Sequence, residues 1–345
     1  MKTERGRLLV GLLLAVLLLA LFFRGVEWVE LGRALRHARP LPLAGLVLTT
    51  IAVYAVRSWR WGGLLAPLGR VRYPDLFSAT FVGFASGLLV PRAGEILRPW
   101  LVSRRYPIPT SAGFATIILE RLVDLITVLA LFALYLFVLP APKAQVQGPA
   151  MGLAKGLGVA GAACALVALA LLLALHANAE RVVGALERLL ARAPRWLRGP
   201  LGGVLRAFPS GLAVLRAPLP HLAFLGLQSI LVWLLISLGF HLNHQAFSIE
   251  LPFHATFLLI AFLVVGVAIP TPGMVGGFHA FYLIALTEVF GVDRTTAVAA
   301  GIAAHALTNL PILVFGLALL GREGLSLGRL AEVTRESGAL QEVRP

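Results

Sequence analysis

Apolar residues gather in long runs along the chain, separated by shorter stretches rich in arginine, proline and glycine. A run of about 20 apolar residues can cross the hydrocarbon core of a bilayer as a helix. Two runs, at 76–90 and 253–269, stop at prolines, and the apolar stretch after each is also short, so each pair predicts a re-entrant hairpin. The longer runs predict six membrane-spanning helices, at residues 8–23, 41–56, 110–139, 151–175, 219–242 and 295–320.

The two interruptions share the pattern G-x-x-x-P-x-x-G. Irregular backbone is tolerated at membrane depth only where it is buried in protein or lines a wet cavity. Paired interruptions in the two halves of a chain point to a transporter binding site in an inverted repeat, although two unrelated loops would give the same pattern. The residues are Gly87, Pro91 and Gly94 in the first break, and Gly266, Pro270, Pro272, Gly273 and Gly276 in the second.

The predicted fold is therefore an all-α polytopic membrane protein with six full spans and two broken hairpins in an inverted repeat. We expect an integral membrane domain over 1–321, with halves at about 1–139 and 151–321, and a cytoplasmic tail at 322–345. A basic amphipathic segment at 177–218 is expected to lie on the cytoplasmic membrane surface.

Composition supports this class. Hydrophobic residues make up 59% of the chain and charged residues 13%, whereas a soluble domain is about 25% charged. The single cysteine, Cys164, excludes an intramolecular disulfide and a multi-cysteine metal site. Three histidines, His241, His244 and His254, have no carboxylate at ligand spacing, so we interpret them as residues at the membrane interface rather than metal ligands. We expect no metal and no cofactor.

The net charge of +14 comes mainly from arginine. Residues 57–111 and 177–218 hold eight and seven arginines, while the segments 140–150 and 243–253 hold one lysine between them. The positive-inside rule then predicts that both termini lie in the cytoplasm. We expect the protein in the inner (cytoplasmic) membrane of the cell. Arg57, Trp59, Arg60 and Trp61 are expected to form an interface anchor that closes the second span. The basic charge thus indicates anionic lipid rather than nucleic acid.

Small residues recur every four positions in the fourth span, which permits close helix contact. This face could pack within the chain or form the seam of a homodimer. Its members are Gly152, Gly156, Ala160, Cys164 and Ala168.

Charged residues also occur among the apolar segments near the first break. Charge at membrane depth costs a few kcal/mol per residue and by default marks a functional site. Guanidinium groups could bind a lipid phosphate, with the acids balancing them, binding a cationic headgroup or carrying a proton. The alternative is that these charges only pair with each other and hold the hairpin. The candidates are Arg92, Glu95, Arg98, Glu120, Arg121 and Asp124.

The second half offers His279, His305 and Asn309. His305 and Asn309 share a helix face because they are four residues apart. A histidine that titrates near neutral pH could couple movement to protons. Hydrogen bonding inside a helix bundle is the alternative.

The segments VPRAGEILRPWLV, ERLVDL and PTPGMVGGFH resemble the transmembrane region of lysylphosphatidylglycerol synthases, a family of flippase-like integral membrane proteins. Met274 and His279 depart from that family's usual Gly and Glu. The resemblance implies translocation of a phospholipid or a polyprenyl-phosphate-linked lipid between leaflets. The full-length synthases carry an aminoacyl-transferase domain after the membrane region; we expect none here, because the chain ends 25 residues after its last predicted span.

Two other functions fit the sequence. A membrane-embedded transferase could use Glu95, Glu120 or Asp124 as general base, although no nucleophile constellation is evident. The protein could instead be a non-catalytic scaffold for a partner enzyme. A lipid flippase, with membrane lipids as its partners, is the first expectation. The sequence has no ATPase motif, so we expect it to work as a uniporter or with protons rather than by direct use of ATP.

Overall fold

The chain is almost entirely helical in a computed structural model that describes residues 2–89, 93–140, 149–191, 214, 216–269 and 271–323. Within those residues no strand occurs, and the prediction of an all-α polytopic membrane protein is confirmed. The helices are α1 (Lys2–Phe23), α2 (Trp28–His37), α3 (Pro40–Leu65), α4 (Tyr73–Leu89), α5 (Ala93–Ser103), α6 (Thr110–Phe137), α7 (Pro149–Ala191), α9 (Leu219–Ala246), α10 (Ala255–Ala268), η2 (Pro272–Met274), α11 (Gly277–Ile284), the π-helical η3 (Ala285–Val289) and α12 (Arg294–Arg322).

Four of the described helices are long and apolar enough to cross a membrane: Pro40–Leu65, Val159–Asn178, Leu219–Ala246 and Arg294–Arg322. They coincide with four of the six predicted spans. Helix α6 corresponds to a fifth predicted span; it is 28 residues long but carries three charged residues. Helix α1 corresponds to the sixth, and its described apolar part is the shorter segment Leu13–Phe23.

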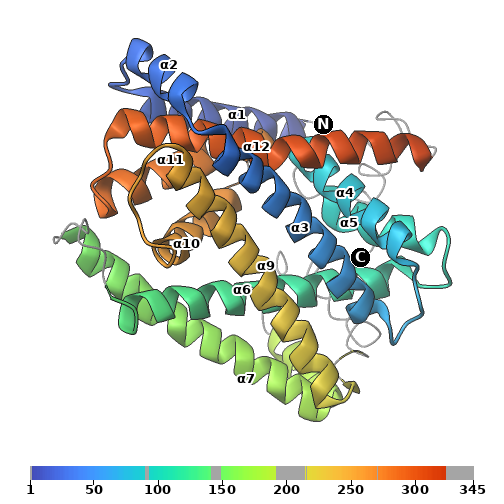
Figure 1. Cartoon of the computed structure of the whole chain (residues 1–345). Coiled ribbons are helices and arrows are strands. Elements are labelled where there is room, and N and C mark those ends of the chain that lie inside the picture. The colour runs from blue at the N-terminus through green and yellow to red at the C-terminus, as the bar shows by residue number, and fades with distance from the viewer. Residues whose placement is uncertain are drawn as a thin grey trace.

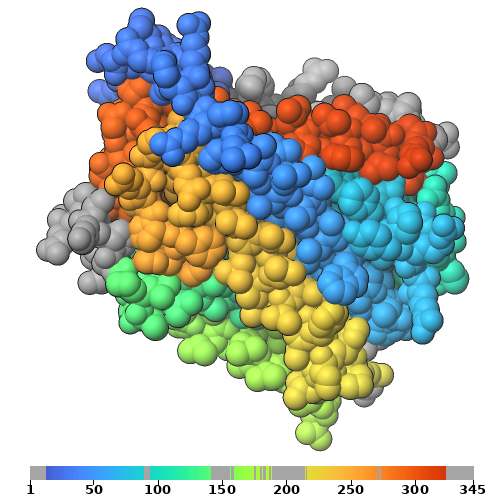
Figure 2. Space-filling view, viewed as in Figure 1, coloured from blue at the N-terminus to red at the C-terminus, as the bar shows by residue number. Residues whose placement is uncertain are grey.

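Helices α3 and α9 cross the middle of the molecule side by side (Figure 1). They run antiparallel, because Gly45 lies against Leu242 and Gly63 against Leu225. Lipid tails are as apolar as leucine, so association in a membrane depends on close packing, which glycine permits. Figure 2 shows the two helices exposed together along one face of the molecule.

The two broken hairpins lie on either side of this pair (Figure 1). Helices α4 and α5 form the first, and α10 with α11 forms the second. Each packs in its own apolar cluster, the first around Trp61, Leu97 and Ile117, the second around Leu258, Tyr282 and Phe290.

The same backbone contact closes both hairpins. A methyl group on Gly94 would overlap the carbonyl oxygen of Gly83, and one on Gly277 would overlap that of Gly266. The glycines of each pair are eleven positions apart in the sequence. Gly87, expected to mark the first break, lies within α4 and touches Gly94 only loosely, since its added carbon would be 3.9 Å from the Gly94 nitrogen. Gly83, which the sequence pattern did not single out, therefore makes the contact in the first hairpin that Gly266 makes in the second.

The second break is a tight turn of left-handed residues. Gly273 and Gly276 have φ angles of 62° and 97°, and Met274 between them has φ of 59°. A side chain is strained in that region, which explains why a glycine is favourable at the position of Met274. Pro91, Arg92 and Pro270 lie outside the described residues.

An ion-pair network joins the first hairpin to the end of α12. Arg105, just after α5, pairs with Asp75 of α4 at 2.7 Å and with Glu323 at 3.1 Å. Ser78 donates a hydrogen bond to the same Glu323 carboxylate at 2.7 Å. These contacts fix the hairpin against α12 at the end away from the break.

The structure corrects two predicted boundaries, the end of the second span and the start of the basic segment. Helix α3 continues to Leu65, so the second span does not end at 56. Helix α7 continues through a kink at Asn178 to Ala191, so the basic segment 177–218 begins as part of this helix; its residues 192–213 and 215 lie outside the described residues, as does the tail 324–345.

The small-residue face of α7 is divided. Ala168 is buried with Ala165, and Gly161 approaches Leu129 of α6. Gly156, Ala160 and Cys164 are exposed. The packing on α6 thus uses a neighbouring face and leaves most of the predicted one uncovered.

The glycine crossings give a direct prediction. Gly94→Ala and Gly277→Ala should each lower the free energy of unfolding by about 1–3 kcal/mol, because the added methyl forces two backbones apart. Gly226→Ala in α9 is the control, since its new methyl meets nothing within 4 Å. Unfolding of the purified protein in detergent, followed by tryptophan fluorescence, measures the difference. Equal stability of all three variants would show that the crossings are not close-packed.

Candidate functional site

Six charged side chains from three helices meet beside the α3–α9 crossing. Arg57 and Arg60 come from α3, Arg98 comes from α5, and α6 supplies Glu120, Arg121 and Asp124. Residues three or four apart share a helix face, so α3 presents two arginines together and α6 presents both carboxylates. All except Arg121 are less than 10% exposed.

Glu120 is the centre of this cluster. Arg98 binds it through two hydrogen bonds, of 3.1 and 3.2 Å, one to each carboxylate oxygen. Arg121 donates to it at 2.6 Å. Arg60 and Arg57 approach the same carboxylate at 3.6 and 3.9 Å. Paired guanidinium–carboxylate bonds of this kind are strong and fix orientation.

Asp124, one turn later, binds the arginines of α3. Arg60 donates to it at 2.6 Å and Arg57 at 3.2 Å. The indole N–H of Trp233 on α9 adds a third hydrogen bond, at 3.3 Å. Arg60 also donates to the hydroxyl of Ser229 on α9. Asp124 therefore joins α3, α6 and α9.

Aromatic rings cover the guanidinium groups. Arg98 lies 4.4 Å from the centre of the Trp61 ring. Arg57, Arg98 and Arg121 all lie within 5.4–5.7 Å of the Phe84 ring. Such cation–π contacts are worth most where water is excluded.

The cluster has more positive than negative charge, because four arginines share two carboxylates. Several guanidinium N–H groups also have no hydrogen-bond partner: Nε and Nη2 of Arg60, Nε of Arg98 and Nε of Arg121. A buried charge is costly unless it is paired and hydrogen-bonded. The cluster, as far as the structure describes it, therefore has a net positive charge.

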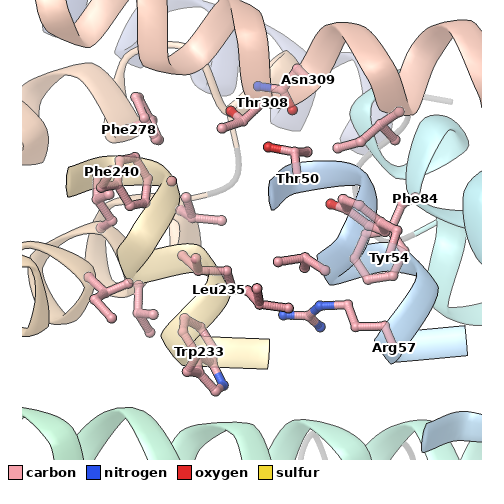
Figure 3. A pocket seen from close by; sticks show the side chains of 18 of the residues that line it. Thr50, Tyr54, Arg57, Phe84, Trp233, Leu235, Phe240, Phe278, Thr308 and Asn309 are labelled. Carbon is pink, nitrogen blue, oxygen red and sulfur yellow. The ribbon is translucent and has the colours of Figure 1, made fainter. Parts of the chain in front are cut away.

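A cavity of about 460 Å³ opens next to the cluster. Its walls come from α3, α6, α9, α10 and α12, with Phe84 and Leu88 of α4, Met274 of the second break and Phe278 of α11. Arg57, Arg121 and Asp124 line one end, near Trp233. Figure 3 shows Arg57 and Trp233 at this end and Thr50, Thr308 and Asn309 at the other, with Tyr54, Phe84 and Leu235 among the side chains between. The volume is in the range of small-molecule binding sites.

The structure brings together most of the residues that the sequence singled out. Arg98, Glu120, Arg121 and Asp124 meet in the cluster, and His305 and Asn309 line the same cavity at its other end. The ring of His279 lies 4.6 Å from that of His305, behind the cavity wall.

Glu95 is placed differently. It is exposed on α5 and takes part in none of the ion pairs among the described residues. Arg92 lies outside the described residues.

Arg57 and Arg60 are the residues that sequence reasoning missed. The expectation that they form an interface anchor with Trp59 and Trp61 is wrong, because Arg57, Arg60 and Trp61 are 6%, 1% and 0% exposed. Only Trp59, at 51%, is exposed. The signal in the sequence was that apolar residues return after Trp61, at Leu64 and Leu65, so the apolar run does not end at the arginines.

Comparison with known proteins agrees with this architecture. Residues 8–316 match the family described as lysylphosphatidylglycerol synthase TM region. The chain belongs to this family. The match covers both hairpins and every residue of the cluster.

A curated relative carries a different name. The protein called glycosyltransferase AglD from Haloferax volcanii is 26% identical over 358 residues, covering 97% of this chain. The chain spans 57% of the length of that relative. Together, family and relative identify a lipid-related, multi-pass membrane protein.

The ion-pair cluster predicts strong dependence of stability on Glu120. Glu120→Ala should lower the free energy of unfolding by about 3–5 kcal/mol, because buried arginines lose their counter-charge. Glu30→Ala is the matched control: it removes the exposed Glu30–Arg33 pair, also at 3.1 Å, and should change stability by less than about 1 kcal/mol. Denaturant unfolding in detergent compares the two. Similar losses in both variants would contradict a structural role for the cluster.

Proposed function

We propose that this protein moves a phosphate-bearing lipid between membrane leaflets, with the phosphate bound at the arginine cluster. The observation that supports this most is the excess of arginine over carboxylate on the wall of a cavity. A phosphate brings the negative charge that the cluster lacks.

Arg121 and Arg57 are the groups placed to bind the phosphate. Both line the cavity, and the side chain of Arg121 is 40% exposed, against 7% or less for the other three arginines. A guanidinium remains charged when desolvated and can hold two phosphate oxygens at once. Glu120 and Asp124 would keep the arginines in place when no lipid is bound.

The acyl chains would remain in the bilayer while the headgroup occupies the cavity. Leu125 of α6 and Val267 of α10 line the cavity and are also 41% and 36% exposed. In this proposal, the two residues mark where the acyl chains would pass from the cavity to the bilayer. Such a route would let the polar headgroup cross inside the protein without drawing the chains through it.

The wider proposal keeps the expected arrangement. The halves 1–139 and 151–321 would form one lipid-translocating domain in the inner membrane, with cytoplasmic N- and C-termini and tail. The partner is an anionic or lipid-linked membrane lipid. The exposed small residues of α7 leave a homodimer as part of this proposal.

A membrane-embedded transferase is the second candidate, favoured by the relative that is called a glycosyltransferase. Glu120 and Asp124 are poorly arranged as general bases, because their oxygens already accept several arginine and tryptophan N–H groups. Of the three acids considered, the exposed Glu95 is the one free of such bonds. The cluster therefore favours binding and transport over catalysis.

Replacement of Arg121 tests the transport proposal. In proteoliposomes with fluorescent phosphatidylglycerol or polyprenyl phosphate, Arg121→Gln should slow lipid movement about ten- to hundredfold, the loss expected for hydrogen bonds to a charged group. Glu120 and Asp124 keep three other arginines, so the variant should fold. Arg33→Gln, which removes a 62% exposed arginine outside the cavity, is the control. Unchanged transport by a folded Arg121→Gln protein would refute phosphate binding at this site.

The transferase alternative has its own measurement. In detergent micelles there are no leaflets, so a flippase should leave radiolabelled lipid chemically unchanged, while a transferase should convert it. We expect no new product by thin-layer chromatography with lipid and an activated sugar donor present. A product that disappears in Glu95→Gln would establish the transferase instead.

A further inference from the structure

The cavity presents two chemically different ends to a ligand. At one end Arg57 and Arg121 offer only hydrogen-bond donors, since a guanidinium has no acceptor. At the other end the polar residues are neutral: Thr50 from α3 faces Thr308 and Asn309 of α12 (Figure 3), and His305 lines the same region. We call these four residues the neutral ring.

Most donors of the neutral ring are already used. The hydroxyl of Thr50 donates to the carbonyl of Leu46 at 2.8 Å, and that of Thr308 to the carbonyl of Ala304 at 2.7 Å. The Asn309 side-chain amide donates to the carbonyl of His305 at 2.8 Å. Each hydroxyl oxygen, and the Asn309 carbonyl oxygen, can still accept.

His305 contributes in the same sense. Its Nε2 lies 3.0 Å from the carbonyl oxygen of Gly273. A carbonyl oxygen only accepts, so Nε2 of His305 carries the proton. In the uncharged imidazole, Nδ1 is then left as an acceptor. The neutral ring is therefore rich in acceptors and suits a ligand that brings hydrogen-bond donors.

Hydroxyl groups fit these acceptors better than an ammonium group. Among the described residues that line the cavity, Asp124 is the one carboxylate, and it lies at the arginine end in bonds to Arg57 and Arg60. An ammonium group at the neutral ring would thus lack a counter-charge, which is costly in a largely apolar cavity.

The separation of the two ends suits one headgroup. Thr50 and Arg57 lie on the same face of α3, seven residues apart, or roughly 10 Å along the axis at 1.5 Å per residue. Part of that distance is covered by the side chains themselves. The remainder accommodates a phosphate and one glycerol or sugar-sized group.

We propose that the cavity selects lipids whose phosphodiester carries a hydroxyl-rich headgroup, a polyol or a sugar, with the phosphate at Arg57 and Arg121 and the hydroxyls at the neutral ring. This rests on the proposed phosphate site and adds the class of headgroup. It assigns Thr50 and Asn309, on two different helices, to headgroup selection.

The test uses lipids that differ only in the headgroup. Phosphatidylinositol and phosphatidylethanol are both phosphodiesters with one negative charge, but only the first carries headgroup hydroxyls. Short-chain forms are added to the purified protein in detergent, and affinity is measured from the shift of thermal unfolding. Fluorescent forms are followed in proteoliposomes. Phosphatidylethanolamine serves as the ammonium probe.

Wild type should prefer phosphatidylinositol over phosphatidylethanol by about fivefold or more, the effect of one or two neutral hydrogen bonds. Asn309→Leu and Thr50→Val should each reduce that preference and leave phosphatidylethanol unaffected. Thr127→Val is the matched control, because this buried threonine also donates to its own helix, at 2.8 Å, but does not line the cavity. Thr50→Val supplies the answer if Asn309→Leu does not fold.

Three results would overturn the inference: no preference in wild type, a preference that survives both variants, or a stronger response to phosphatidylethanolamine. The binding measurement separates it from the transport proposal. If no lipid moves in proteoliposomes but the preference in detergent is present and lost in the variants, the headgroup selection stands and transport fails. If Arg121→Gln moves lipid normally, the phosphate site fails.

Discussion

Two carboxylates on one face of α6 hold four guanidinium groups, and the arrangement of the first half of the chain depends on this pairing. Glu120 reaches Arg98 of the broken hairpin, and Asp124 reaches Arg57 and Arg60 of α3. An unpaired charge at this depth is expensive, so the three helices cannot separate without a large cost. The packing of α3 against α9 then places Trp233 and Ser229 on the same cluster.

The same pairing leaves the site incomplete, which connects structure to function. Ion pairing within the protein is compatible with the proposed binding of a lipid phosphate. The carboxylates fix where the arginines lie, and the surplus of arginine leaves net positive charge in a cluster whose Arg57 and Arg121 line the cavity. A site that is rigid before the ligand arrives loses less conformational freedom when it binds.

The hairpins place this chemistry at the cavity. Their glycine crossings bring two backbones into direct contact, so the two helices of each hairpin pack closely against each other. Phe84 of the first hairpin and Met274 of the second break both line the cavity. The cavity therefore lies between two similar elements from opposite halves of the chain, and the proposed selection of a headgroup uses residues that only this arrangement brings together.

The sequence by itself determined the all-helical membrane class, the two breaks and the shared face of Glu120 and Asp124. These follow from local properties: the length of an apolar run, the effect of proline and glycine on a helix, and the helical repeat. The partners were decided by tertiary structure. Arg57 and Arg60 follow an apolar run with tryptophans beside them, a pattern typical of a membrane interface, and their acids are more than 60 positions away. That Gly83 rather than Gly87 lies at the first crossing also depends on how two helices pack. Such a contact between helices is not determined by the residues next to it in the sequence.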